Sequence, residues 1–360
     1  MASPDSSTES HRTGFTRWAG WLHRYFLIVL LATYALAGLF PAPGTVIREF
    51  AVTLPGGSQE RASMLLLAIL LFCAAAVIQW SQVRDLLERP SVLLVGLLTA
   101  WLGPALVVVV FSPLLPWLAR NETTTGMMVG FALVAAMPVA NSAAGWTQNA
   151  GGNIALSLGL IILSILLSPL TTPNLLKLMG LLLSDADTQR IELVVTQFSG
   201  WRFILWVILP SLAGAVTAWL AGHRRITHAK PAFRIVTLVT ILVLNYANAS
   251  LAIDKVWVSE PVTVIALAAV MAAAVSIVGI LLATIQARLF GLSRASWMAL
   301  AFGLSMKHTG LALVLAGEFL RDQPRVILVV LLATLAQHIA AAAVDLHIQR
   351  ARGAVAVAAG

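Results

Sequence analysis

Runs of about 20 apolar residues repeat along almost the whole sequence. Each run is long enough to cross a bilayer as a helix, because the hydrocarbon core is roughly 30 Å thick and a helix rises about 1.5 Å per residue. The composition agrees, since 59% of the residues are hydrophobic and only 11% are charged. We therefore predict an all-α polytopic membrane protein, embedded in a lipid bilayer.

The apolar runs divide into ten predicted spans: 24–41, 62–82, 91–113, 124–148, 153–180, 201–222, 233–253, 261–287, 296–319 and 325–347. An even number of spans places both termini on one side. Of the 23 Lys and Arg residues, 13 fall on that side and 9 on the other, and Lys307 is the remaining one. Because positive loops stay in the cytoplasm, we expect an inner (plasma) membrane protein with both termini cytoplasmic.

The chain divides into three expected parts: a disordered cytoplasmic tail (1–21), a ten-helix domain (22–349) and a C-terminal tail (350–360). The first apolar run has the basic flank of a signal peptide, but its length and the following spans favour an uncleaved helix. The net charge of +8 sits in short loops and at the termini, without a basic stripe. This pattern orients membrane spans and does not indicate a nucleic-acid partner.

Two spans contain helix-breaking and polar residues near their middle. Span 124–148 contains Pro138, and span 296–319 contains Gly303 and Gly310. Each of the two is the fourth in its group of five spans, and matching interruptions of this kind indicate a transporter binding site. Because five is odd, the halves must have opposite topology. We predict inverted repeats at about 22–183 and 191–349, with broken helices at these three residues.

Lys307 is the only formal charge between Arg294 and Glu318, and it lies near the centre of its span. A charge at the middle of a bilayer is costly and usually functional. The structural alternative is that its ammonium neutralises the carbonyls at a helix C-terminus. The adjacent His308 either takes part in function or only bonds unwound backbone.

Three segments resemble the bile acid:sodium symporter family: "SQVRDLLERPSVLLVGLLTAWLGPAL" (81–106), "GGNIALSLGLIILSILLSPLTTP" (151–173) and "KHTGLALVLAGEF" (307–319). The resemblance runs from about Leu22 to Gln349. It implies ten helices in two inverted repeats, with the broken fourth helices crossing in a core domain beside a panel domain. It also implies that the chain carries an organic anion by alternating access, and that sodium ions bind near the crossover.

The resemblance is weakest at the positions that hold sodium in the family. Thr99 stands in place of Gln, Ala143-Ala144 in place of Ser-Asn and Ile161 in place of Thr. Gly303 stands in place of an acid and Lys307-His308 in place of Gln-Asn, while Ser157 retains a hydroxyl. A hard cation needs several oxygen ligands, and most of these side chains have none. We therefore expect no sodium site like that of the family, no other metal and no cofactor.

Two hypotheses follow for Lys307. In the first, its ammonium replaces the bound sodium, and transport is uniport or exchange. In the second, Lys307 or His308 exchanges protons, since buried lysines can lose theirs near neutral pH and histidine titrates there. The residues expected to bind the small organic anion are Asn141, Ser142, Lys307, His308 and Thr309, with Lys307 and His308 also in coupling. Further candidates for lining the cavity are Ser157, Ser305, Asn245 and Asn248.

Other functions make different demands on the sequence. A sodium-coupled symporter and a non-transporting sensor of the same fold both stay open. A metalloid exporter needs a thiol in span 124–148, whereas the only cysteine, Cys73, lies in span 62–82. The spans contain no oriented Ser-His pair, paired carboxylates or His-Glu-x-x-His motif, so we expect no enzyme activity.

Overall fold

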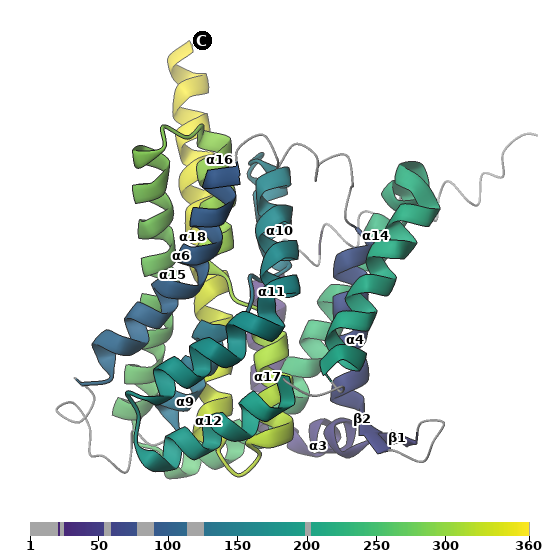
Figure 1. Cartoon of the computed structure of the whole chain (residues 1–360), viewed down its shortest axis with the longest axis vertical. Coiled ribbons are helices and arrows are strands. Elements are labelled where there is room, and N and C mark those ends of the chain that lie inside the picture. Colours follow the sequence, from purple (N-terminus) through teal and green to yellow (C-terminus); the bar gives the residue numbers. More distant parts are fainter. Residues whose placement is uncertain are drawn as a thin grey trace, which may run out of the picture. The chain divides into compact units, whose positions relative to one another are not determined.

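A computed structural model of the chain describes residues 21, 25–53, 59–77, 90–113, 126–198 and 203–359. Apart from Trp21, the predicted N-terminal tail lies outside these ranges. The described part is almost entirely helical, with one two-stranded antiparallel sheet (Figure 1). It forms two compact units: unit 1 is Met1–Gln79 with Ile204–Ser250, and unit 2 is Trp80–Phe203 with Leu251–Gly360. Each unit draws on both predicted repeats.

Unit 1 contains α2 (Phe26–Leu39), α3 (Pro41–Glu49), β1 (Ala51–Thr53), β2 (Gln59–Arg61), α4 (Ala62–Ala76), η2 (Ile204–Ile208) and most of α14 (Leu209–Ser259). The chain bends by 95° between α2 and α3, where Pro41 opens the second helix. In α14, Gly222 has a φ of 74°, a conformation that glycine adopts without strain. Residues 223–232, which lie between predicted spans 201–222 and 233–253, were expected to form a loop. They are instead helical, and the helical geometry of α14 is broken at Gly222.

Among the described residues, unit 2 contains the end of α14 and the helices α6 (Pro90–Phe111), α9 (Met127–Ala136), α10 (Ser142–Asn149), α11 (Ile154–Gly180), α12 (Asp185–Phe198), α15 (Val262–Leu289), α16 (Arg294–Ser305), α17 (Thr309–Phe319) and α18 (Pro324–Ala359). Helix α18 includes residues 350–359, which the sequence analysis assigned to a tail. This part is rich in alanine, the strongest helix former. A buried apolar cluster joins α6, α11 and α16 through residues such as Leu97, Leu160 and Phe302.

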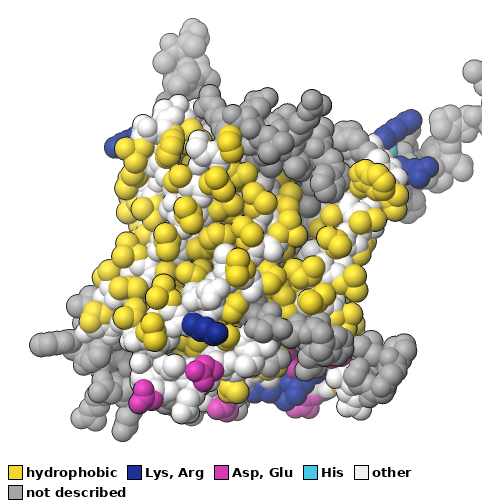
Figure 2. Space-filling view, in the orientation of Figure 1, with side chains coloured by type: hydrophobic (Ala, Val, Ile, Leu, Met, Phe, Trp, Pro, Cys, Tyr) yellow, Lys and Arg dark blue, Asp and Glu magenta, His cyan; other side chains and the backbone are white. Residues whose placement is uncertain are grey.

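Six helices in the described residues are long and apolar enough to cross a membrane, or seven if the bent pair α2–α3 counts as one span. Figure 2 shows hydrophobic side chains along the middle of the helices and charged side chains toward their ends. The chain is therefore an integral multi-pass membrane protein. Predicted spans 124–148 and 296–319 are not among the six because each is broken into two short helices. The ten-helix count stays a prediction.

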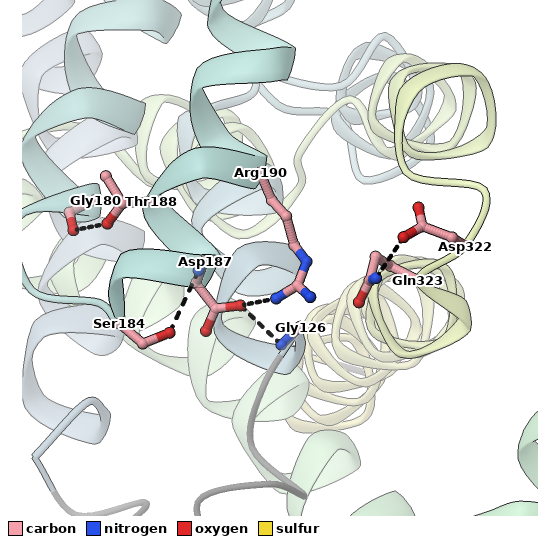
Figure 3. Close-up of polar contacts among 8 residues, drawn as sticks. All are labelled: Gly126, Gly180, Ser184, Asp187, Thr188, Arg190, Asp322 and Gln323. Carbon is pink, nitrogen blue, oxygen red and sulfur yellow. Dashed lines mark hydrogen bonds and ion pairs between the residues drawn. The ribbon is translucent and has the colours of Figure 1, made fainter.

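Helix α12 occupies a segment that the sequence analysis had assigned to no span. Its buried face consists of Asp187, Ile191, Val194 and Val195, at the spacing of an amphipathic helix. The Asp187 carboxylate accepts hydrogen bonds from Arg190 Nη1 (2.8 Å) and from the backbone N–H of Gly126 (3.1 Å), as Figure 3 shows. Gly126 is the residue before α9, so α12 anchors the start of the first broken helix.

Gly279 lets α15 pack directly on the backbone of α16. A Cβ atom at this position would lie 2.4 Å from the carbonyl oxygen of Leu304 and 2.8 Å from Cα of Ser305. These backbone atoms belong to the last turn of α16, just before its break. Helix α15 therefore packs against the backbone just before the break.

We expect Gly279→Ala to destabilise the protein by about 1–3 kcal/mol, because backbone on both sides must move apart. The measurement is the Tm of the purified protein in detergent micelles. Gly180→Ala is the control, since a Cβ there would meet its nearest neighbour at 3.7 Å. An equal change in Tm for the two variants would contradict this packing.

Candidate functional site

The first broken helix is interrupted between Ala136, where α9 ends, and Ser142, where α10 begins. Pro138 lies inside this break. Proline has no N–H to donate and pushes the preceding residue toward extended geometry. Met137 accordingly has φ −67° and ψ 150°. Pro138 therefore lies where the sequence analysis expected the break.

The second broken helix is interrupted between Ser305 and Thr309. The break consists of residues 306–308, so the two expected hinge glycines lie outside it. Gly303 is in the last turn of α16, where a Cβ would lie 2.9 Å from the side chain of Leu160. Gly310 is in the first turn of α17. Gly303 therefore lies close to the Leu160 side chain of α11, and the hinge role of the two glycines stays a prediction.

The two breaks pair with each other as an isolated antiparallel bridge, in which Val139 is opposite Lys307. The flanking hydrogen bonds run from Ala140 N to Met306 O (3.0 Å) and from His308 N to Pro138 O (2.9 Å). These bonds satisfy backbone groups that the interrupted helices leave open. The two broken helices therefore meet at their unwound segments.

The Lys307 ammonium lies inside unit 2 and bonds to backbone oxygens. The residue is 1% exposed, and its Nζ donates to the carbonyl oxygens of Met137 (3.0 Å) and Ala100. Met137 is the C-cap of α9, where the helix dipole is negative. The Ala100 carbonyl would normally bond to the residue four positions later, but that residue is Pro104, which has no N–H. Lys307 thus satisfies two carbonyls that their own helices leave unpaired.

Side chains of α11 and α18 hold the unwound peptides in place. Gln337 Oε1 accepts from Lys307 N (2.8 Å), and Gln337 Nε2 donates to Thr309 Oγ1 (3.3 Å). On the other segment of the bridge, Ser164 Oγ accepts from Val139 N (3.0 Å). Both residues of the bridged pair therefore donate to a buried polar side chain. Ser164 was not predictable from the sequence, because a lone serine in an apolar helix has no distinguishing pattern.

His308 is the N-cap of α17. Its Nδ1 accepts from Leu311 N (3.1 Å), so the ring proton sits on Nε2. The Nδ2 atom of Asn141 lies 3.4 Å from Nε2, and among the described residues Asn141 Oδ1 has no partner. Turning the Asn141 amide by 180° replaces this donor–donor contact with a hydrogen bond and gives Oδ1 a partner. His308 is then a neutral capping residue.

The other predicted residues of unit 2 have different surroundings. Ser142 is partly exposed at the start of α10, and Asn141, the N-cap, makes no capping bond with its side chain. Ser305 is buried and donates to Phe302 O (3.4 Å). Ser157 is fully buried, and within the described residues its hydroxyl has no partner.

Asn245 and Asn248 belong to unit 1, where both are buried. Tyr34 donates its hydroxyl proton to Asn245 Oδ1 (2.8 Å), and Asn248 Nδ2 donates to Leu244 O (2.8 Å). These contacts join or lie along helices of unit 1. A cavity-lining role for the two asparagines stays a prediction.

The positions to which the family resemblance assigns the sodium ligands carry few side-chain oxygens. The side chains of Ala143, Ala144, Ile161 and Gly303 carry no oxygen. Thr99 has a hydroxyl, but it donates to Val95 O (2.8 Å) and accepts from Gln286. The carbonyls of Ala100 and Met137 bond to the Lys307 ammonium. In the described part of the chain, no group of three or more His, Cys, Asp or Glu could hold a metal.

Ser164→Ala should lower the free energy of unfolding by about 1–3 kcal/mol, because it leaves the buried Val139 N–H without an acceptor. Ser168→Ala is a matched control one turn along α11. Both serines are fully buried and donate to the carbonyl three residues earlier, but only Ser164 also accepts from the break. Unfolding followed by tryptophan fluorescence in micelles measures the difference. Similar losses for both variants would refute the anchoring role.

No curated protein matches the sequence. The model of the sodium bile acid symporter family matches residues 64–259, more than half of the chain. That range includes the first break and all of α11. The chain belongs to the sodium bile acid symporter family.

Proposed function

We propose that the protein is an inner-membrane carrier of an organic anion, in which the Lys307 ammonium takes the place of the coupling cation. Transport is then sodium-independent and proceeds by uniport, exchange or proton coupling. Family membership supports a transporter and not an enzyme. The observation that carries the rest is the buried ammonium on the Ala100 and Met137 carbonyls.

The ammonium does what a bound monovalent cation does at such a site. It places one positive charge on carbonyl oxygens at the crossover, and the negative end of the α9 dipole attracts that charge. The ion pairs of Arg190 with Asp187 and of Arg325 with Glu260, both in the described part of unit 2, do not involve the ammonium. Its positive potential therefore remains available to attract an anion into a low-dielectric region.

The local geometry supports the inverted repeat. In the bridge, Ala140 N donates to Met306 O, and His308 N donates to Pro138 O. On each segment, the residue after the central one therefore bonds to the residue before the central one on the other segment. Val139 and Lys307 also each donate to a side chain on the helix that follows their own broken helix. This pattern has the symmetry of a two-fold axis through the bridge. We propose ten helices in two inverted repeats, with both termini cytoplasmic.

The N-terminus of α10 is the better of two places for the anion. The α17 N-terminus is capped by His308, whereas α10 has no side-chain cap and begins at the partly exposed pair Asn141 and Ser142. The positive end of the helix dipole suits a carboxylate or sulfonate. Lys307 would then act on the anion by its charge, and Thr309 and His308 would hold the second break in register.

Alternating access requires two bodies that move relative to each other. The chain has two compact units, and the crossover lies entirely within unit 2. We propose that unit 2 is the core that carries the anion and that unit 1 is the panel. A ligand sensor with the same fold would bind the anion without moving it, so flux separates the two functions.

Uptake into proteoliposomes tests this proposal, with labelled taurocholate as a bulky probe and pyruvate as a small one. Replacing sodium by choline should leave the initial rate within about twofold, because no sodium ion is needed to charge the site. A pH gradient imposed without sodium then separates proton coupling from uniport or exchange. A strict sodium requirement would overturn the proposal.

Lys307→Ala should lower the rate by about tenfold or more, since it removes the charge and exposes two unpaired carbonyls. Lys177→Ala, at an exposed position in the last turn of α11, is the matched control and should transport normally. Unchanged uptake by Lys307→Ala would show that the lysine is not required for transport.

A further inference from the structure

A second site lies in unit 2, away from the two breaks. A cavity of about 590 Å³ is lined by α15, α18 and Trp297 of α16. Alanines on the facing helices leave this space: Ala269 and Ala273 on α15, and Ala336, Ala340 and Ala343 on α18. All of the lining side chains are apolar except His347 at one end. We call this cavity the α15–α18 groove.

The α15–α18 groove runs along the helices. Its lining residues on α18 extend from Leu332 to His347, roughly 22 Å at 1.5 Å per residue. This length exceeds the roughly 15 Å of one leaflet, half of the hydrocarbon core. Ile277 and Ile339 line the groove and remain 51% and 49% exposed, so it is open along its side. A flexible hydrocarbon chain lying parallel to the helices fits these features.

Three exposed arginines lie beyond the end of the groove that Trp297 and His347 mark. Arg350 follows His347 by three residues on α18, and Arg294 precedes Trp297 by three residues on α16. Residues three apart on a helix share a face. Arg288 lies in the last turn of α15. If the helix face that lines the groove is continued to this turn, Arg288 lies beside it. The three helices therefore bring cationic side chains to one end of an apolar groove.

Little negative charge opposes these arginines. Among the described residues of α15, α16 and α18, the acidic residue near this end is Asp345. It lines no part of the groove and accepts a hydrogen bond from Gln349 (2.7 Å). The ring of Trp297 is held by its Nε1, which donates to Thr284 Oγ1 (3.0 Å). Indole rings prefer the level of the lipid headgroups, which places the arginines beside the phosphates.

We propose that the α15–α18 groove binds an anionic phospholipid, with one acyl chain along the alanines and the phosphate against Arg288, Arg294 and Arg350. Basic side chains between membrane helices recognise such headgroups. A second copy of the chain is disfavoured, because a symmetric dimer through this face would bring the two arginine clusters together. The site goes beyond the transport function and does not depend on what is carried.

Native mass spectrometry of the full-length protein tests the headgroup contact. The protein is equilibrated in micelles with equal amounts of phosphatidylglycerol and phosphatidylcholine. We expect phosphatidylglycerol to be retained about tenfold more often. The double variant Arg294→Gln/Arg350→Gln should bring the ratio close to one, whereas Arg224→Gln/Arg225→Gln, which alters two exposed arginines of unit 1, should keep it. Equal retention of both lipids by the wild type would overturn the proposal.

A second pair of variants tests the groove itself. Ala340→Phe should fill it and reduce retention of both lipids, while Val270→Phe, at a 58% exposed position of α15 outside the lining, should not. Retention that is unaffected by Ala340→Phe would place the lipid elsewhere. A wild-type dimer that Ala340→Phe converts to a monomer would identify a second copy as the occupant and refute the lipid.

Discussion

The Lys307 ammonium bonded to two backbone carbonyls is the interaction on which the rest of the site depends. One carbonyl is free because Pro104 cannot donate to it, and the other ends the first half-helix. At membrane depth no water is available to pair such groups, so an unpaired carbonyl or an isolated ammonium would each be costly. Together they satisfy one another. The same contact joins α6 to both broken helices.

The remaining contacts of the crossover follow from this arrangement. The two breaks pair as a short bridge, Ser164 and Gln337 accept from its two central residues, and His308 caps the helix that leaves it. Each bond uses a group that an interrupted helix would otherwise leave open. An ammonium hydrogen-bonded at the crossover supplies positive charge for an anion without first recruiting a metal ion, which is the physical reason to expect sodium-independent transport.

The membrane class and the first break were predictable because each depends on residues that are close in sequence. Apolar runs predict spans, and Pro138 interrupts a helix wherever it lies. The bond between Lys307 and the carbonyl freed by Pro104 was not predictable, because it requires knowing that α6 lies beside the second break. The close approach of Gly303 to Leu160 was not predictable for a related reason, because it requires knowing that α11 lies beside α16. Helix α12 was missed because its apolar face is too short to read as a span.

The central claim is tested most directly by the Tm of the wild-type protein, measured in sodium chloride and in choline chloride at equal ionic strength. A ligand that binds only the folded state stabilises it by about 2.7 kcal/mol when present at 100 times its Kd, whatever the transported substrate. If the ammonium replaces the cation, the two Tm values should coincide. A Tm that rises specifically with sodium concentration would show that the crossover still binds the ion, and would contradict the account.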